Sequence, residues 1–379
     1  MEQNLLSAHD YTDEQTFALE QQKIFSNSWH FCGLAEDLSQ PEQYITVQAG
    51  NNNLVVYRNE HGELNALHNI CRHRGMQLVE GKGKLKRTII CPYHDWTYSQ
   101  TGELKSMPKQ KQDFVGVDKA CLSLKPAQAG IWRGMIWVHP DPNAITLSEY
   151  FAPMAQHLAP YDVESLVEAK DYIIEETIDA NWKLVVENYI DHYHLAQLHA
   201  GTLAMYDHKR AEFGFAGEHF YFWEPLTKDY HADITKNAPY PMLMDKNDAR
   251  LGAWVPMLFP CIGLAETESS WSVFQITPLS VNKTQVVIRS KVKACSMMAY
   301  FKQASASYSY WQRKVKGKYQ NVDESHALGS GDFMKEDIYV CEQLQKSLAS
   351  PYFEFGPSAN QGEWPIREFQ KRVLSFLKS

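Results

Sequence analysis

The spacing of hydrophobic and polar positions changes several times along the chain, and each change predicts a different kind of element. Residues 3–26 are polar with apolar positions at helical spacing, which predicts one or two short amphipathic helices. From Trp29 to about residue 140, short β-prone runs alternate with turns rich in Gly and Asn, so this stretch is expected to be all-β. The clearest of these runs are YITVQAG, NLVVYR, TIICPY and GMIWVHP.

The second part of the chain mixes both periods. Residues 171–178 are typical of a strand, and residues 181–199 of a helix with an irregularity inside it. Aromatic and β-branched residues form strand-like runs across 213–290, whereas residues 333–348 and 364–377 have helical periodicity. The whole pattern predicts an α+β fold, in which an all-β segment lies beside a larger domain of sheet and helices.

Composition narrows the class of protein. Of the 379 residues, 44% are hydrophobic and 22% are charged, which is ordinary for a globular protein with a substantial core. The formal net charge of −8 argues against nucleic acid as a partner, because phosphate binding usually requires a basic face. The polar first residues lack the pattern of a signal peptide, and no apolar run approaches the ~18 residues of a transmembrane helix. We therefore expect a cytoplasmic protein without membrane contact.

The seven cysteines do not form the pattern of a disulfide framework, because they are sparse and odd in number. Cys71 and Cys91 differ from the rest, since each lies at metal-ligand spacing from a histidine. The others are expected to be small, buried apolar residues: Cys32, Cys121, Cys261, Cys295 and Cys341.

The segments CRH at 71–73 and CPYH at 91–94 together supply two thiolates and two imidazoles. A zinc ion accepts such a set in tetrahedral geometry. A Rieske [2Fe–2S] cluster takes the same groups, with both thiolates on one iron and both neutral imidazoles on the other. Because each segment contributes one cysteine and one histidine, two parallel loops can present cysteine to one iron and histidine to the other. This arrangement favours the cluster, since zinc fingers more often pair cysteine with cysteine.

CRHRG at 71–75 and CPYHDWTY at 91–98 resemble the Rieske signature of ring-hydroxylating oxygenases, flanking residues included. The resemblance implies a helical N-terminal segment at 1–28, a Rieske domain at 29–142 and a catalytic domain at 143–379. It also implies that the catalytic domain has an antiparallel sheet flanked by helices. The residues implied to bind the cluster are Cys71, His73, Cys91 and His94.

A second group of histidines lies in the segment NWKLVVENYIDHYHLAQLHAGT. Two histidines and one carboxylate on one face of Fe(II), with open positions opposite, form the ligand set of O₂-activating iron sites. On a straight α-helix His194 and His199 would point about 140° apart. They can share a metal only where the helix bulges or ends between them. Taken alone, a histidine-rich helix is equally consistent with a polar surface.

This segment resembles the catalytic motif of the same oxygenase family, in which Asn-Trp-Lys precedes Glu-Asn, an acidic residue, Tyr-His and a later His. The resemblance implies that His194 and His199 bind iron and that His192 does not. It also places Asn188 and Asp191 in the catalytic site.

Asp191 lies three residues before His194, so the two side chains can share a helix face. A metal-bound histidine usually donates its other N–H to an acceptor such as a carboxylate. The family resemblance implies a larger role, in which Asp191 connects His194 to a cluster ligand, His94, of a neighbouring subunit and so forms the electron route.

The third iron ligand must come from elsewhere in the chain. Spacing does not choose among the acids near the start of the late helix. The family's late motif is an acidic pair followed by a helix with Gln-Lys near its end, which matches 336–337 and 345–346 and implies Asp337. Glu336 is expected to be an exposed acid in the first helical turn, where the helix dipole favours it. The chemically able residues are Asp332, Glu336, Asp337 and Glu342.

The resemblance further implies the terminal oxygenase of a multicomponent system. Electrons from NAD(P)H would arrive through a separate reductase, with or without a ferredoxin, and pass from the cluster to a mononuclear Fe(II) that uses O₂ to mono- or dioxygenate an organic substrate. The chain has no GxGxxG nucleotide fingerprint, which agrees with a separate reductase. The family also implies a homotrimer; an added small β subunit is a less favoured alternative.

Aromatic residues are dense between 206 and 271, in the region that helps to form the substrate cavity in this family. Core packing is nevertheless the commoner role for most such rings. A small aromatic substrate is expected first, and a quaternary ammonium or N-methyl compound held by cation–π contacts is the alternative. Two rivals of other classes are a zinc-stabilised binding protein without redox activity and an electron carrier without the catalytic iron. The rings concerned are Phe213, Phe215, Phe220, Tyr221, Phe222, Trp223, Tyr230, Tyr240, Trp254 and Phe259.

Overall fold

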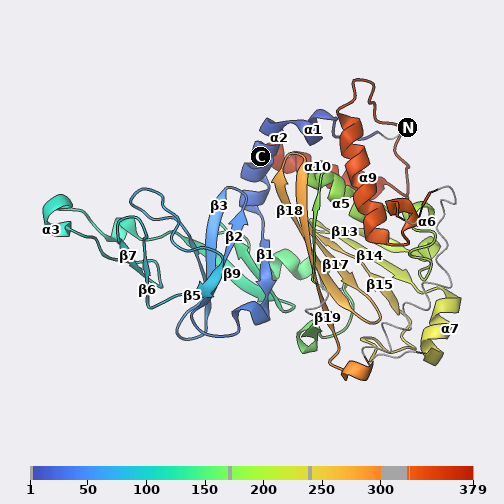
Figure 1. The fold of residues 1–379 in the computed structure, drawn as a ribbon, viewed down its shortest axis with the longest axis horizontal. Helices are drawn as coiled ribbons and strands as arrows, with labels where there is room; N and C mark the ends of the chain where they lie inside the picture. The colour runs from blue at the N-terminus through green and yellow to red at the C-terminus, as the bar shows by residue number, and fades with distance from the viewer. Residues whose placement is uncertain (1–2, 170–172, 238–240, 300–321, 324, 379) are drawn as a thin grey trace. The chain divides into compact units, whose positions relative to one another are not determined.

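The computed structural model describes residues 3–169, 173–237, 241–299, 322–323 and 325–378. Backbone contacts divide the chain into two compact units (Figure 1). The small unit is Leu19–Ala152, and the large unit combines Met1–Ala18 with Pro153–Ser379. The domain boundaries expected from the sequence, after residues 28 and 142, stay a prediction, because compactness alone does not assign residues 19–28 and 143–152 to a function.

The small unit contains two antiparallel sheets. The larger has seven strands in the order β1-β10-β9-β4-β3-β2-β5, and the smaller has three in the order β6-β7-β8. Their bounds are β1 His30–Leu34, β2 Gln43–Ala49, β3 Asn52–Arg58, β4 Leu64–His68, β5 Lys82–Lys84, β6 Thr88–Ile90, β7 Thr97–Ser99, β8 Leu104–Ser106, β9 Pro126–Trp132 and β10 Met135–His139. The helices are α2 Glu14–Lys23, which crosses into this unit from the large one, α3 Gln110–Asp113 and α4 Leu147–Phe151.

The hairpin of β2 and β3 shows why this sequence forms strands. Val55 and Tyr57 on β3 pack into one buried cluster, while Leu54 and Val56 pack into another, as expected when alternate side chains leave a sheet on opposite faces. Gly50 lies in the turn with φ of 57°, and a Cβ there would come within 2.3 Å of the backbone oxygen of Gln21. A larger residue at this turn would therefore collide with the backbone.

The large unit is built on one antiparallel sheet, with nine strands among the described residues. Its main path is β11-β19-β18-β17-β15-β14-β13; β12 also pairs with β19, and β16 with β14 and β17. The bounds are β11 Val167–Glu168, β12 Ile174–Ile178, β13 Glu212–Ala216, β14 His219–Pro225, β15 Gly252–Trp254, β16 Met257–Leu258, β17 Ile262–Glu266, β18 Trp271–Ser280 and β19 Lys283–Val292.

Helices pack on this sheet and hold the site. Helix α5 contacts β18 and β19, and both α9 and α10 contact α5 (Figure 1). The bounds of the helices are α1 His9–Thr12, α5 Trp182–Ile190, α6 Leu195–Leu198, α7 Lys228–Asn237, α9 Phe333–Leu348 and α10 Trp364–Lys378. The expected α+β class, an all-β unit followed by an antiparallel sheet with flanking helices, is confirmed. None of the helices in the described part of the chain has the length and apolarity that a bilayer crossing requires.

Candidate metal centres and cavity

Two loops of the small unit repeat the same backbone arrangement. In each loop the cysteine N–H donates to the carbonyl five residues later, and the cysteine carbonyl accepts from the N–H four residues later. These distances are 2.8 and 3.0 Å around Cys71, and 2.9 and 3.0 Å around Cys91. The fourth residue after each cysteine has a positive φ, 74° at Gly75 and 56° at Asp95. The repeat of cysteine and histidine in the sequence is therefore a repeat in structure.

The side chains of these loops form a cysteine pair and a histidine pair. Cys71 and Cys91 are buried, with 2% and 1% of their surface exposed. The Nδ1 atoms of His73 and His94 lie 3.2 Å apart, and the His73 ring stacks on Trp96. Two nitrogen ligands of one tetrahedral metal ion would lie about 3.4 Å apart, given bonds of about 2.1 Å. The histidine pair therefore fits a shared iron.

The geometry separates a two-iron cluster from a single zinc. Around one tetrahedral ion every pair of donor atoms would lie within about 4 Å. Among the described residues, three potential metal ligands with donor atoms within 4.8 Å of one another occur in one place, and that place is in the large unit. The four residues of the two loops do not form such a group. The cysteine and histidine pairs are therefore too far apart for one ion, as a cluster with thiolates on one iron and imidazoles on the other requires.

Tyr98 connects the cluster loops to the core of the small unit. Its hydroxyl oxygen accepts from the Arg72 N–H at 3.0 Å and lies 3.3 Å from the Sγ of Cys71. Because the oxygen already accepts the amide, the hydroxyl proton is available to the sulfur. A hydrogen bond to a ligand sulfur is one of the features that set the potential of an iron–sulfur cluster.

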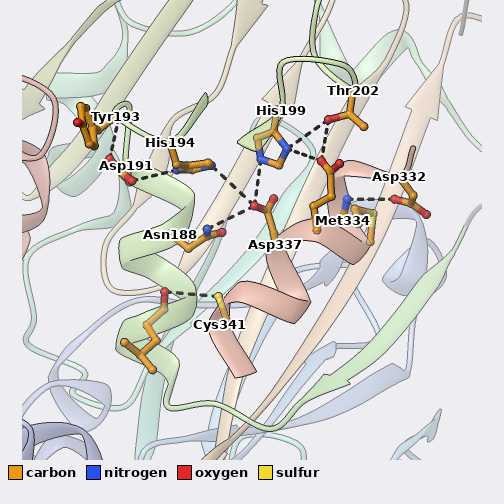
Figure 2. A network of polar contacts seen from close by, with 12 residues as sticks. Asn188, Asp191, Tyr193, His194, His199, Thr202, Asp332, Met334, Asp337 and Cys341 are labelled. Atoms are coloured by element: carbon orange, nitrogen blue, oxygen red, sulfur yellow. Dashed lines mark hydrogen bonds and ion pairs between the residues drawn. The ribbon is translucent and has the colours of Figure 1, made fainter. Parts of the chain in front are cut away.

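The second centre depends on a break in a helix. Asn181 begins α5 by accepting from the Lys183 N–H, and the helix ends at Asp191, which is extended with φ −75° and ψ 112°. His194 then begins the short helix α6, and His199 follows its end. The irregularity predicted between residues 181 and 199 is thus a complete interruption before His194, and the short helix α6 then ends at Leu198, between the two histidines (Figure 2).

His194, His199 and Asp337 converge on one point, with their donor atoms within 4.8 Å of one another. Asp337 Oδ1 lies 3.0 Å from His199 Nε2 and 3.7 Å from His194 Nε2 (Figure 2). The Asn188 amide donates to the same carboxylate oxygen at 3.3 Å. The set has the composition of an Fe(II) site with open positions. We call these three residues the triad.

Two acids hold the histidines of the triad from behind. His194 Nδ1 donates to Asp191 Oδ2 at 3.0 Å (Figure 2). His199 Nδ1 donates to Glu336 Oε2 at 2.8 Å. These bonds select the tautomer that leaves both Nε2 atoms directed at Asp337. Burial lowers the pKa of His199, but hydrogen bonds and charges from Asp337 and Glu336 outweigh it and raise that pKa to about 9. The same anionic surroundings would attract a divalent cation.

The prediction that Glu336 is an exposed first-turn acid is wrong. Only 5% of its surface is exposed, and it also accepts from the Thr202 hydroxyl at 2.8 Å. The other acids near this helix have separate tasks. Asp332 caps α9 by accepting from the N–H groups of Met334 and Lys335, and Glu342 accepts from the Asp179 N–H at 3.3 Å.

Glu187 and His192 lie in the same segment but do not join the triad. Glu187 is buried and accepts from the Tyr11 hydroxyl at 2.7 Å and the Gln370 amide at 2.9 Å. Burial raises the pKa of Glu187 to about 7, against the opposing effect of these bonds and of Lys183. His192 Nε2 instead lies 2.8 Å from the His208 carbonyl. Glu187 therefore ties the N-terminal segment to α5.

A cavity of about 380 Å³ opens beside the triad, and all three triad residues line it. Its other walls are mostly apolar and come from α5, the sheet and α9. The rings that line it are Tyr189, Tyr206, Phe274 and Phe333, and its remaining acids are Glu176 and Glu224. A second cavity of about 300 Å³ shares Asn188 and His194 with the first and is also lined by Asp191.

The sequence pattern did not identify the residues of the cavity wall. Among the described residues, none of the aromatic residues singled out between 213 and 259 lines the cavity; Tyr240 lies outside the described residues. Phe213, Phe220 and Phe222 instead pack against one another. Strand alternation could have found part of the wall, because Ser272, Phe274 and Ile276 lie on one face of β18.

The predicted burial of the remaining cysteines needs one correction. Cys261 and Cys341 are buried as expected, Cys32 and Cys295 are half-buried, and Cys121 is exposed. The expectation of burial is therefore wrong for Cys121. Its thiol donates to the neighbouring Asp118 carboxylate at 3.3 Å.

Comparisons with known proteins assign a family to each of the two parts of the chain. Residues 28–125 match the family model of the Rieske [2Fe-2S] domain, and residues 158–379 match that of the ring hydroxylating alpha subunit, catalytic domain. The chain is 36% identical over 196 residues to a glycine betaine monooxygenase oxygenase subunit of Chromohalobacter salexigens, covering 51% of this chain and 42% of that protein. It is 33% identical over 193 residues to a carnitine monooxygenase oxygenase subunit of Acinetobacter pittii, covering 50% and 51%. The matches thus span about half the length of these two relatives.

Other similarities extend over the whole chain. A chloroplastic choline monooxygenase of Atriplex hortensis is 25% identical over 379 residues, covering 97% of this chain and 77% of that protein. The crystal structure of the quaternary ammonium Rieske monooxygenase CntA with L-carnitine matches with a TM-score of 0.72 at 22% identity, covering 98% and 94% of the two chains. A naphthalene 1,2-dioxygenase structure with indole has a TM-score of 0.69 at 20% identity, covering 98% and 92%. These two structures support the fold. The chain belongs to the family of Rieske oxygenase alpha subunits, in which a [2Fe–2S] domain is followed by the ring-hydroxylating type of catalytic domain.

Proposed function

We propose that this chain is the terminal oxygenase component of a Rieske system that monooxygenates a small molecule carrying a quaternary ammonium group. Electrons from NAD(P)H would reach it through a separate reductase, directly or through a ferredoxin. The observation that carries the oxygenase function is the convergence of His194, His199 and Asp337 on one wall of a cavity, in a chain that also has a Rieske domain.

The residues fit the two groups that this function requires. Cys71, Cys91, His73 and His94 would hold the [2Fe–2S] cluster, and the triad would hold one Fe(II). When bound, the cluster supplies electrons one at a time and the iron supplies O₂ activation. The chain's own residues then orient the metal ligands and exclude water from the cavity. Asp191 and Glu336 orient the two histidines, Asn188 holds the Asp337 carboxylate, and the mostly apolar walls keep the reacting space dry.

The substrate class rests on the relatives. Those named above are called glycine betaine, carnitine and choline monooxygenases, and each name contains a quaternary ammonium compound. They favour the alternative in the sequence analysis over the aromatic substrate that was expected first. Cavity rings that can make cation–π contacts agree with this choice.

The assembly is proposed to be a homotrimer. Its support is the family's electron route between subunits, together with the position of Asp191 beside the second cavity rather than in the substrate cavity. One related structure is described as giving insight into inter-subunit electron transfer. Light scattering on the purified protein tests the proposal, since a mass of about three chains is expected.

A single-turnover experiment tests the function without the unknown reductase. Protein reduced with dithionite is exposed to ¹⁸O₂ together with choline, glycine betaine, carnitine or naphthalene, and products are identified by mass spectrometry. We expect an oxidised product of a quaternary ammonium compound, which carries up to one ¹⁸O atom if its carbonyl group is reduced with borohydride before it exchanges with water. Two labelled atoms in naphthalene and no oxidation of the ammonium compounds would overturn the substrate class. No oxidised product from any compound would count against the oxygenase.

The Tyr98→Phe variant should lower the reduction potential of the cluster. The hydroxyl hydrogen bond to Cys71 Sγ stabilises the more negative, reduced cluster, so its loss makes reduction harder. A difference of about 1 kcal/mol between the two redox states corresponds to about 40 mV for one electron. Redox titration followed by EPR measures the shift. An unchanged or higher potential would show that the hydroxyl does not donate to the sulfur.

Glu336→Ala should weaken metal binding at the triad while the cluster is kept. Without this carboxylate His199 loses the acceptor that fixes its ring, and such outer contacts typically contribute about 10–100-fold to metal affinity. Titration of the chelator-treated protein with Co²⁺ or Fe²⁺ measures the affinity. Glu342→Gln, on the same helix but bonded to the Asp179 amide, is the matched control and should bind as the wild type does.

A further inference from the structure

We propose that Glu224 determines the charge specificity of the cavity, because its carboxylate is the counter-ion of the positively charged group of the substrate. The inference rests on the proposed function and deepens it, since it assigns the recognition of charge to one residue. It also predicts that the cavity selects its ligand by the ligand's permanent positive charge and not by the ligand's size and shape alone.

Glu224 is a buried acid that faces the cavity. It lies on β14, lines the same cavity as the triad, and has only 3% of its surface exposed. Its Oε2 accepts from His208 Nδ1 at 2.6 Å. Its other oxygen, Oε1, has no hydrogen-bond partner among the described residues. One side of the carboxylate is therefore fixed, and the other is available to a ligand.

His208 binds Glu224 through one of its two ring nitrogens. His208 donates through Nδ1 to Glu224, while its Nε2 is buried and has no hydrogen-bond partner in the described structure. This bond engages one of the two carboxylate oxygens of Glu224, and Oε1 remains available to a positively charged group in the cavity.

A buried carboxylate without a cation is expensive, and a cationic ligand would relieve that cost. A quaternary ammonium group has charge but no N–H, so it binds through charge and through the faces of aromatic rings. The cavity offers both, because Tyr206 and Phe274 line it together with Glu224. The acid Glu176 also lines the cavity, but it is exposed on β12, where water screens its charge. Glu176 is therefore a matched control.

Calorimetry with two ligands of the same shape tests the proposal. Choline and its neutral carbon analogue, 3,3-dimethylbutan-1-ol, are titrated into the purified full-length protein. We expect wild type and Glu176→Gln to prefer choline by about tenfold or more, since opposite charges attract more strongly where water is excluded. Glu224→Gln should reduce that preference to about twofold or less, and Glu224→Asp should retain most of it.

The outcomes separate the two proposals. If wild type does not prefer choline over the carbon analogue, the substrate class fails and the inference fails with it. If wild type prefers choline and folded Glu224→Gln does so equally, the role of Glu224 is overturned and the proposed function stands.

A measurement on wild type covers the case in which Glu224→Gln does not fold. In crystals of the wild-type protein with arsenocholine, anomalous scattering locates the arsenic atom. Arsenic beside Glu224 Oε1 supports the proposal, and arsenic in any other part of the cavity overturns it.

Discussion

Replacing Asp337 with alanine is expected to remove the mononuclear iron and abolish turnover while the [2Fe–2S] cluster stays in place. Asp337 contributes the carboxylate oxygen 3.0 Å from His199 Nε2 and 3.7 Å from His194 Nε2. Without it, two neutral imidazoles would have to hold Fe(II) alone. Iron analysis should fall from about three atoms per chain to about two, and the EPR signal of the reduced cluster should persist.

A second acid on the same helix provides the control. Glu342→Gln changes the charge of α9 equally, but this side chain bonds to the Asp179 amide and not to the triad. It should keep about three irons per chain and full turnover. Equal loss of both metals in Asp337→Ala, or retention of the mononuclear iron, would contradict the assignment of Asp337.

Periodicity and motif spacing predicted the elements that carry the site. The helix expected over residues 333–348 is α9 with the same bounds, because a helix that packs on one face repeats its apolar positions every turn. Two histidines five residues apart can share a metal only if the helix bulges or ends between them, and the short helix α6 does end at Leu198, just before His199. The strands of the small unit were predicted equally well, since their side chains alternate between two buried clusters.

The supporting residues could not be predicted in the same way. Glu336 was expected in solvent because helix position and dipole are local properties, whereas its burial depends on His199 and Thr202, more than a hundred residues earlier. Glu224 had no signal at all, because a single acid in a strand full of rings matches no periodic pattern. The spacing of residues in the sequence indicates contacts within one helix or strand. The contacts of Glu336 and Glu224 instead join different elements.

The helix α7 is the clearest omission in the fold. Strand-like runs and no helix were predicted across residues 213–290, yet Lys228–Asn237 is helical. The high density of aromatic and β-branched residues around it concealed a short polar segment with helical spacing. The cavity wall was missed for a related reason, since aromatic density identifies a region but not which face of each strand meets the cavity.

Asp191→Asn, reconstituted with excess Fe²⁺ because His194 also loses its acceptor, is expected to slow the transfer of electrons from the cluster to the site of oxygen chemistry. The Asp191 carboxylate accepts from His194 Nδ1 at 3.0 Å and from the Tyr193 N–H at 2.7 Å. It is also the residue proposed to connect His194 with His94 of the partner subunit. Asparagine can still accept from Tyr193 through its oxygen, but it presents an amide N–H₂ towards His194, so the connection is lost and the local fold is kept.

Stopped-flow absorbance of the reduced protein, mixed with O₂ and choline, measures the oxidation of the cluster. We expect a rate about 10–100-fold lower than in wild type, with unchanged cluster EPR, in protein reconstituted with excess Fe²⁺. Tyr193→Phe is the matched control, because Tyr193 is an exposed neighbour whose N–H, not its ring, contacts Asp191. If Asp191→Asn loses the mononuclear iron, the carboxylate serves mainly to hold His194; a wild-type rate would exclude it from the electron route altogether. These outcomes can be distinguished because Asp191 contacts the triad through His194, whereas Asp337 is itself one of the three triad residues.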